Sequence, residues 1–264
     1  MTAFTDRLGG GVMVRLGYSA QAVRDAEAPH LAAGEPLMQR AAHALAGAVQ
    51  RELAGREAGA PEHPSWRVVL LVGSGNNGGD ALFAGAELAG LRVGGARIDV
   101  VAVGVGSRMH DAGREAAAAA GVRLLSLPPD GPAEVVAVGA AVDLAVNADV
   151  IVDGMLGTGT SADAPALRGS ARELVSGILD AVETMPSGSR RPIVVAVDLP
   201  SGVHPDSGAV ADGVVLPASV TVTFGGIKAG LLRGAGARVA GRVELAMIGI
   251  EDDLAAVPPL VVAP

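Results

Sequence analysis

Three aspartates stand where predicted strands end, in positions that could support acid–base chemistry. Asp80 closes a polar, glycine-rich run at residues 73–80, and both Asp153 and Asp198 directly follow β-branched runs. The carboxyl ends of parallel strands share one edge of a sheet, so we expect the three aspartates to line a common crevice. Carboxylates there can transfer protons or, with amide and hydroxyl oxygens, hold a cation. Taken singly, each aspartate has a simpler interpretation, as a cap for a turn or a helix start.

The glycines of the first turn are spaced to approach an anion. Gly73, Gly75 and Gly78 satisfy G-x-G-x-x-G between a predicted strand and a predicted helix, where free backbone N–H groups favour a phosphate-bearing ligand. A tight structural turn would use the same residues. An NAD-dependent oxidoreductase should also place an acid at the end of its second strand to bind a ribose. Here Asp99 falls inside or at the start of that strand, so the fit to an oxidoreductase is poor.

The elements that must position these residues alternate along the chain. Short β-branched runs separated by alanine-rich stretches predict βαβ units and a mostly parallel sheet. The predicted strands are residues 67–72, 97–103, 122–125, 150–152, 193–197, 219–224 and 242–246. The predicted helices are residues 79–91, 111–120, 132–146 and 170–185, preceded by a helix that Ser19 caps and that ends near Ala32, and by a helix over residues 35–53. We therefore expect an α/β fold with a doubly wound, Rossmann-like sheet and an N-terminal helical extension.

Length and composition suit one globular unit. The chain has 264 residues, of which 50% are hydrophobic and only 2% aromatic, so aliphatic side chains must build the core. That composition excludes a disordered chain. We expect residues 1–17 to form a loosely ordered leader and residues 18–264 to form a single domain.

The net charge, the cysteine count and the hydropathy pattern exclude further classes of protein. The 20 Lys and Arg residues against 28 Asp and Glu residues give a net charge of −8, so no nucleic-acid partner is expected. The chain has no cysteine, which excludes a thiol nucleophile, a disulfide framework and a thiolate metal site. No run of about 18 apolar residues and no secretory signal is recognisable, so we expect a cytoplasmic protein that does not bind membranes.

Four motifs occur in order along the chain. They are Gly-Ser-Gly-Asn-Asn-Gly-Gly-Asp at residues 73–80, Ile-Val-Asp followed by Gly-Thr-Gly at 151–159, Val-Asp-Leu-Pro-Ser-Gly at 197–202 and Thr-Val-Thr-Phe-Gly-Gly-Ile-Lys-Ala-Gly-Leu at 221–231. With these motifs, and with its helical opening at residues 18–20 and 37–41, the chain resembles the NAD(P)H-hydrate epimerases, the YjeF N-terminal domain family. The resemblance covers residues 17–250.

The resemblance implies an isomerase of nicotinamide cofactor repair, which interconverts the R and S forms of NADHX and NADPHX. It implies one K⁺ per subunit, held by Asn77, Asp153 and Ser201, although these oxygen donors alone would not distinguish K⁺ from Na⁺ or Mg²⁺. The substrate-binding residues that it implies are Asn76, Asn77, Gly78, Gly79, Asp80, Gly157, Thr158, Gly159, Thr160, Ser161, Ala162, Asp163 and Asp198. It further implies a homodimer and a dehydratase partner, either as a domain of the native chain or as a separate protein.

Inversion at the hydrated carbon suggests roles for three residues. If the ring nitrogen expels hydroxide and water adds to the other face, the enzyme needs a proton donor and a base. We assign this chemistry to Asp198, with Asp80 as the second candidate. Lys228 would supply positive charge near a phosphate or the leaving oxygen.

Two other functions remain as alternatives. One is a non-catalytic relative that uses the same fold as an interaction or dimerisation module, and the other is an NAD-dependent oxidoreductase. Intact acids argue against the first, because a binding module does not require Asp80, Asp153 and Asp198. The poor position of Asp99 for binding a ribose argues against the second.

Overall fold

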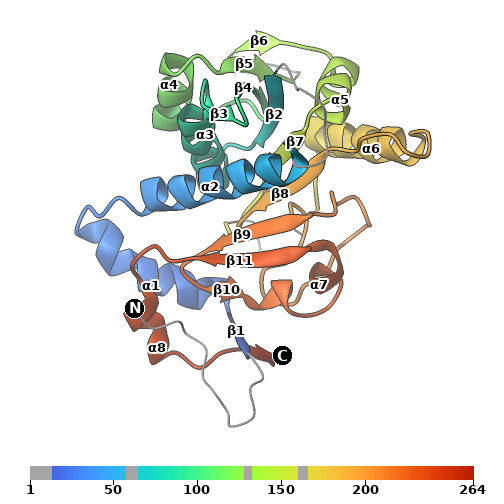
Figure 1. Cartoon of the computed structure of the whole chain (residues 1–264). Helices are drawn as coiled ribbons and strands as arrows, with labels where there is room; N and C mark the ends of the chain where they lie inside the picture. Colours follow the sequence, from blue (N-terminus) through green and yellow to red (C-terminus); the bar gives the residue numbers. More distant parts are fainter. Residues whose placement is uncertain (1–13, 58–64, 128–132, 160–165) are drawn as a thin grey trace.

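Most of the described chain is organised around one large β-sheet (Figure 1). The computed structural model describes residues 14–57, 65–127, 133–159 and 166–264. The strands of the large sheet are β2 (Ser65–Val72), β3 (Arg92–Val93), β4 (Ala96–Gly104), β5 (Arg123–Ser126), β6 (Glu134–Val135), β7 (Val150–Gly154), β8 (Ile193–Val197), β9 (Val220–Phe224) and β11 (Arg242–Ala246). Their order is β11-β9-β8-β7-β2-β4-β5-β6, with β3 paired to β4.

The sheet reverses its direction of growth between β2 and β7. From β2 the chain builds outward through β4, β5 and β6, and it then returns to place β7, β8, β9 and β11 on the other side of β2. Every described pairing is parallel except that of β3 with β4. In open α/β sheets, ligands bind at the carboxyl ends of the strands beside such a reversal. The predicted doubly wound, mostly parallel sheet is confirmed.

Helices cover both faces of this sheet. The described helices are α1 (Ala20–Ala32), α2 (Leu37–Glu57), α3 (Asn76–Leu88), α4 (Asp111–Ala119), α5 (Val138–Val146), α6 (Gly169–Glu183), α7 (Gly236–Val239), α8 (Glu251–Ala255) and the 3₁₀ turn η1 (Ala229–Leu231). Buried side chains of α2, α3 and α4 pack on one face, and those of α5 and α6 pack on the other. Among the described residues, no helix combines the length and the apolar character that crossing a bilayer requires.

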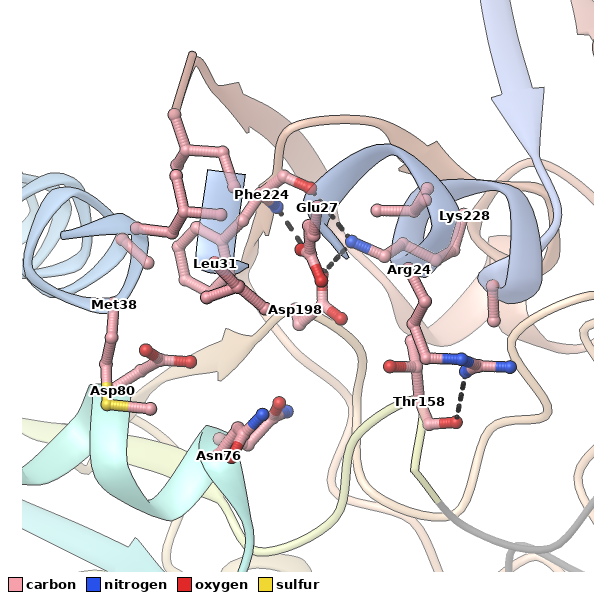
Figure 2. Close-up of a pocket in the computed structure, with 16 residues that line it drawn as sticks. Arg24, Glu27, Leu31, Met38, Asn76, Asp80, Thr158, Asp198, Phe224 and Lys228 are labelled. Atoms are coloured by element: carbon pink, nitrogen blue, oxygen red, sulfur yellow. Dashed lines mark hydrogen bonds and ion pairs between the residues drawn. The ribbon is translucent and has the colours of Figure 1, made fainter. Parts of the chain in front are cut away.

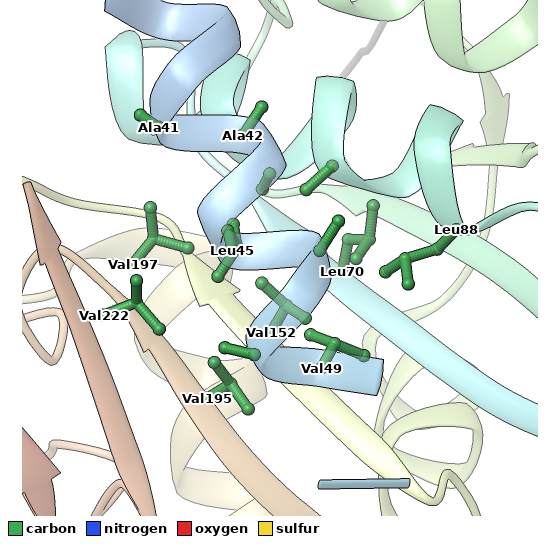
Figure 3. Close-up of a cluster of buried hydrophobic side chains, with 14 of the residues drawn as sticks. Ala41, Ala42, Leu45, Val49, Leu70, Leu88, Val152, Val195, Val197 and Val222 are labelled. Carbon is green, nitrogen blue, oxygen red and sulfur yellow. The ribbon is translucent and has the colours of Figure 1, made fainter. Parts of the chain in front are cut away.

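The strands are apolar on both sides because both faces are covered. In β2, Leu70 belongs to the core under α2 and α3, whereas its neighbour Leu71 belongs to the core under α5 and α6. Figure 3 shows Leu45 and Val49 of α2 lying over Val152 of β7 and Leu70. Burying each such aliphatic side chain contributes about 1.5–3 kcal/mol. The predicted aliphatic core thus fixes α2 and α3 above the carboxyl edge of the sheet.

A second, smaller sheet pairs three short strands, β1 (Arg15–Tyr18), β10 (Ile227–Lys228) and β12 (Val261–Ala263). β1 is parallel to β10 and antiparallel to β12. We expected residues 15–17 to belong to a loosely ordered leader, but their backbone pairing with two strands gives them a defined place. Residues 1–13 of the expected leader lie outside the described residues. Because β10 ends at Lys228, this small sheet positions one of the predicted catalytic side chains.

Two helices begin three or more residues away from their predicted starts. Helix α3 begins at Asn76 rather than at residue 79, because Gly75 takes the extended N-cap conformation and tertiary contacts of the next residues override the low helix propensity of Asn and Gly. Helix α5 begins at Val138, and the residues just before it form β6, which pairs with β5. Residue 132, where we expected that helix to begin, lies outside the described residues. The earlier start of α3 places the polar run of the first motif within its first turns.

Candidate active site

A cavity of about 110 Å³ opens at the carboxyl edge of the large sheet (Figure 2). Its lining comes from α1, the start of α2, the first turns of α3 and the residues that follow β7 and β8, together with Phe224 at the end of β9 and Lys228 of β10. Pockets for drug-sized ligands measure about 300–1,000 Å³, so this cavity would enclose one ring rather than a whole dinucleotide. The ionisable side chains in the described lining are Arg24, Glu27, Asp80, Asp198 and Lys228.

Asp198 and Lys228 form a buried ion pair on the pocket wall. Lys228 Nζ donates to Asp198 Oδ1 at 2.5 Å and to the carbonyl oxygen of Phe224 at 2.9 Å. The hydroxyl of Thr223 also donates to Asp198 Oδ1, at 3.0 Å. Because Asp198 and Lys228 are only 5% and 2% exposed, each charge needs the other as compensation. Lys228 therefore orients Asp198 and has few donors left for a ligand.

The backbone of Asp198 adopts an unusual conformation. Its φ of 65° lies in the left-handed region, and no other non-glycine residue among those described has a positive φ. Aspartate tolerates this region better than most residues do, and such strain persists where the surrounding structure fixes it. The N–H of Asp198 donates to the carbonyl oxygen of Val222 at 2.7 Å, which holds the turn in place. The turn after β8 thereby presents the carboxyl group to the pocket, as the motif predicts.

Asp80 lies on α3, and its buried side chain has no hydrogen bond to any described residue. Its side chain lines the pocket near Met38, and the residue is 6% exposed (Figure 2). No residue in the described part of the chain donates a hydrogen bond to its carboxyl group. Burial raises the pKa of Asp80 well above its ordinary value, and the negative charges of Asp198 and Glu27 add to this rise, against the opposing charge of Lys228. Asp80 therefore holds a proton more readily than an ordinary aspartate does.

Helix α1 supplies two ionisable pocket residues that the sequence analysis missed. Glu27 lies in the pocket wall, and burial raises its pKa while the positive charges of Lys228 and Arg24 oppose the rise. Arg24 donates to the carbonyl oxygen of Thr158 at 3.0 Å, which links α1 to the loop after β7. A signal for Glu27 is present in the sequence, because Glu27 follows Val23 by four residues and Arg24 by three, the spacings of neighbours on a helix surface. A carboxyl group on an otherwise apolar helix stripe indicates a polar site beneath it.

The three predicted cation ligands meet in a separate buried group, which we call the Asp153 cluster: Asn77, Asp153 and Ser201. Ser201 donates to Asp153 through its hydroxyl at 2.5 Å and through its backbone N–H at 2.8 Å. Asn77 Nδ2 donates to the carbonyl oxygens of Val197 at 2.6 Å and Leu156 at 3.1 Å. The Ser201 hydroxyl also accepts from the N–H of Leu156 at 2.8 Å.

The Asp153 cluster differs from our expectation in one respect. Asp153 is fully buried and does not line the pocket, whereas we expected all three aspartates to share one crevice. Its carboxyl group points instead to Ser201, on the neighbouring loop after β8. Burial raises the pKa of Asp153 although the hydrogen bonds from Ser201 and Met155 oppose this rise. Only Asn77 of the cluster also lines the pocket.

The other predicted substrate-binding residues divide into four groups. Asn76 and Thr158 line the pocket. Gly78 and Gly157 instead permit close packing: a Cβ atom on Gly78 would lie 2.0 Å from the carbonyl oxygen of Gly73, and one on Gly157 would lie 2.2 Å from Asn77 Oδ1. Gly79 and Gly159 are absent from the described lining. The remaining predicted residues, Thr160, Ser161, Ala162 and Asp163, lie outside the described residues.

A larger cavity of about 580 Å³ lies between the sheet and α5, but its chemistry is different. Its rim carries Arg123 and Asp99, which pair at the surface with Glu134 and Arg97 at 3.3 Å and 3.4 Å. Exposed ion pairs of this kind interact only weakly because water screens their charges. The smaller cavity contains Asp80, a buried carboxyl group that accepts no hydrogen bond from any described residue, and it is the better candidate for an active site.

The comparisons with known proteins identify the family of the chain. The family model described as YjeF-related protein N-terminus matches residues 34–230, about three quarters of the chain. The chain belongs to this family. The matched range includes Asn77, Asp80, Asp153, Asp198 and Lys228, and the α1 residues of the pocket precede it.

Similar proteins from bacteria carry functional names. A protein of Clavibacter michiganensis subsp. michiganensis named NAD(P)H-hydrate epimerase is 47% identical over 247 residues, covering 93% of this chain and 94% of the relative. One of the same name from Microbacterium testaceum is 46% identical, covering 93% and 83%. The bifunctional NAD(P)H-hydrate repair enzyme Nnr of Mycobacterium leprae is 39% identical, and the match covers 80% of this chain but only 37% of that protein.

A solved structure supports the fold. The crystal structure of the yeast protein YNL200c superposes with a TM-score of 0.61 at 20% sequence identity, and it covers 81% of this chain and 82% of the yeast chain. At that identity the likeness supports the α/β architecture alone.

Proposed function

We propose that this protein is an NAD(P)H-hydrate epimerase, which interconverts the R and S hydrates of NADHX and NADPHX at C6 of the nicotinamide ring. The observation that carries the proposal is the ring-sized pocket, in which Asp80 has no hydrogen-bond partner among the described residues. The names of relatives that are 46–47% identical over almost the whole chain support it. Epimerisation at such a site would change no oxidation state.

The chemistry requires that a proton reach the departing oxygen. When the ring nitrogen pushes its electron pair towards C6, the C6–O bond breaks and the hydroxyl leaves as water if it receives a proton. An iminium cation remains until another water adds to the opposite face. We assign the proton of the first step to Asp80, because its buried carboxyl group has a raised pKa and no described residue uses its oxygens.

Asp198 then has a different role from the one that we proposed on sequence grounds. Its Oδ1 already accepts from Lys228 and Thr223 at 2.5 Å and 3.0 Å, so proton transfer there would have to disrupt a buried ion pair. A fixed carboxylate beside the ring would instead stabilise the iminium cation electrostatically. Lys228 would orient that carboxylate. Because its ammonium group already donates to Asp198 and to Phe224, it would have few donors left for the substrate.

We further propose that the Asp153 cluster holds one K⁺ per chain. Asp153 is a fully buried carboxyl group with no Lys, Arg or His partner among the described ion pairs, so its charge is uncompensated by the protein. The donors are hard oxygens with a single carboxylate, and no group of three or more His, Cys, Asp or Glu that could hold a metal occurs among the described residues. Such a set suits a monovalent cation better than Mg²⁺ or Zn²⁺. When bound, the ion would neutralise Asp153 and steady the loop after β7.

The cation proposal can be tested by thermal unfolding. We expect the unfolding midpoint to be higher in KCl than in choline chloride at equal ionic strength, because an ion that binds only the folded state stabilises it. Ser201→Ala should remove most of that difference, whereas Ser207→Ala, an exposed serine of the following loop, should keep it. Equal midpoints in both salts for the unsubstituted protein would refute the proposal.

The function itself is tested with isolated hydrates. Incubating the purified protein with the R hydrate of NADHX should yield the S hydrate on chromatography, at a rate proportional to protein concentration and absent after heat inactivation. If the folded protein interconverts the epimers no faster than buffer alone does, the result favours the non-catalytic interaction module. Consumption of NADH with an added substrate would favour the oxidoreductase.

The setting of the enzyme is also part of the proposal. We propose that it acts in the cytoplasm, since a chain without cysteine does not depend on an oxidising compartment. The fusion of a similar segment within the bifunctional repair enzyme of Mycobacterium leprae supports a dehydratase as the partner that consumes one epimer. A homodimer remains a prediction, which light scattering of the purified protein would check.

A further inference from the structure

Inversion at C6 needs two proton carriers, and the proposed function names only Asp80. One carrier protonates the hydroxyl that leaves, and the other accepts a proton from the water that adds to the opposite face. A ring held in a cavity of about 110 Å³ has little freedom to turn over. The second carrier must therefore also line the pocket, on another wall.

Three of the ionisable side chains in the described lining are already engaged. Asp198 and Lys228 bind each other at 2.5 Å. Arg24 donates to the carbonyl oxygen of Thr158 at 3.0 Å and to the side chain of Gln21 at 2.7 Å. Hydrogen bonds or an ion pair thus hold each of these three side chains.

Glu27 has a defined position and no such contact. The N–H of Ala20 at the start of α1 donates to Asp206 Oδ1 at 2.7 Å, and near the end of the helix His30 Nε2 contacts Asp253 Oδ2 at 2.8 Å. The helix is therefore tied down on both sides of Glu27. Within the described residues, no hydrogen bond or ion pair engages the Glu27 carboxyl group, which reaches the pocket from α1 while Asp80 reaches it from α3 (Figure 2).

We infer that Glu27 is the second proton-transfer group of the epimerase, and that it works on the face of the nicotinamide ring opposite to Asp80. This inference rests on the proposed function. It assigns a catalytic role to a residue that precedes the matched family range, and it makes α1 a wall of the active site.

The two groups account for every proton and electron pair. Asp80 gives its proton to the departing hydroxyl, which leaves as water while the nitrogen pair forms the C6=N bond. Water then bonds to C6 from the Glu27 side, its extra proton passes to Glu27, and the C6=N pair returns to nitrogen. In the reverse direction the two carboxyl groups exchange roles, so each turnover leaves the pair of carboxyl groups with one proton.

The surrounding charges divide the roles in the same way. Glu27 faces the positive charges of Lys228 and Arg24 as well as the negative charge of Asp198, whereas Asp80 faces two negative charges, Asp198 and Glu27, and only Lys228 opposes them. The resting state should therefore have the proton on Asp80 and a charged Glu27. Because the two groups interact, a bell-shaped pH profile would report properties of the pair. The acidic limb corresponds to protonation of Glu27 and the alkaline limb to ionisation of Asp80.

The experiment compares Glu27→Gln with Asp25→Asn, which removes the same charge from an exposed position on the same helix. We expect Glu27→Gln to lower kcat by about 100-fold or more, with KM changed by less than about threefold. Its residual activity should lose the acidic limb of the pH profile. Asp25→Asn should retain the kcat and the profile of the unsubstituted protein.

Other outcomes separate this inference from the proposed function. If the unsubstituted protein interconverts the hydrates but Glu27→Gln keeps its kcat, or loses activity with the acidic limb intact, the role of Glu27 is refuted and the epimerase proposal stands. If the unsubstituted protein has no activity, the proposed function itself fails. Should Glu27→Gln not fold, Glu27→Asp carries the test: a lower kcat with the acidic limb retained supports the role, and loss of that limb overturns it.

Discussion

Asp153 and Asp80 are both buried near the reversal of the large sheet, but they differ in their hydrogen bonds. Asp153 accepts from the Ser201 hydroxyl, the Ser201 N–H and the Met155 N–H at 2.5, 2.8 and 3.4 Å. Asp80 accepts from no described residue, and it lines a cavity. Burial raises the pKa of both carboxyl groups, so burial alone does not distinguish them. The carboxyl group with satisfied oxygens holds the structure together, and the one without partners is left to act on a ligand.

The same contrast holds for the residues around them. The Asp153 cluster joins the loops after β7 and β8 through direct side-chain and backbone contacts. In the pocket wall, Glu27 of α1 and Asp80 of α3 face the cavity, and neither carboxyl group has a hydrogen bond or ion pair to a described residue. Substitutions should therefore affect stability in the Asp153 cluster and rate in the pocket wall.

The largest expected effect is that of Asp80→Asn on the rate. Asparagine keeps the shape of the side chain but cannot supply a carboxyl proton, so kcat for hydrate epimerisation should fall by roughly 10²–10⁴-fold. Samples quenched at timed intervals, with chromatographic separation of the epimers, would measure this kcat. Asp252→Asn, which changes an exposed residue of α8, serves as the control and should keep its rate. A rate for Asp80→Asn close to that of the control would contradict the role of Asp80 as the proton donor.

The next effect is that of Ser201→Ala on stability. Removing the hydroxyl leaves the buried Asp153 with one donor fewer, so the free energy of unfolding should fall by about 2 kcal/mol, or the midpoint by roughly 4–8 °C. Chemical and thermal denaturation followed by circular dichroism would measure the change. The exposed Ser207→Ala should change the free energy of unfolding by less than about 0.5 kcal/mol. Equal effects of the two substitutions would show that the Asp153 cluster does not hold the loops.

A smaller effect concerns the pH dependence of stability. At acidic pH both the folded and the unfolded protein carry a protonated Asp80. As pH rises above the ordinary value of 3.8, the unfolded chain loses this proton while the folded protein keeps it, because the folded pKa is raised, and stability falls until the folded pKa is passed. Asp80→Asn should therefore raise the unfolding midpoint by about 2–4 °C at alkaline pH and leave it nearly unchanged at acidic pH. A stabilisation that is independent of pH would contradict the raised pKa.

The smallest effect extends the comparison to an exposed cluster. His30 contacts Asp253 and Glu35, which raise its pKa above 6.5, so its stabilising charge is fully present below 6.5 and is lost as pH rises through the raised value. His30→Gln should lower the unfolding midpoint slightly at acidic pH and leave it unchanged at alkaline pH. His43→Gln, at a more exposed histidine on α2, is the control. A larger loss at alkaline pH would reverse the expected sign.

Two acidic residues of the pocket could be predicted from the sequence because the ends of strands are easy to recognise. Asp80 and Asp198 come after apolar runs, and the rule that parallel strands share one carboxyl edge brought them together correctly. The same rule placed Asp153 at that edge but could not show that its side chain turns away from the pocket. That direction depends on Ser201, a residue 48 positions later, and only the fold brings the two together.

The place of Glu27 in the pocket and the existence of the small sheet could not be predicted from the sequence, for different reasons. A glutamate on an amphipathic helix is recognisable, but which surface the helix covers depends on the contacts of its ends with Asp206 and Asp253. The strands β1, β10 and β12 have two to four residues, too few for a periodic pattern. Tertiary pairing alone gives them their conformation.

A crystal structure with bound NADPHX would test the central claim most directly, because it would locate the reacting carbon relative to both carboxyl groups. The account predicts that the hydrated ring occupies the cavity, with its C6 oxygen within about 3 Å of Asp80 or Glu27 and the other carboxyl group facing the opposite side of the ring. A ring bound between the sheet and α5, or one that contacts neither carboxyl group, would contradict it.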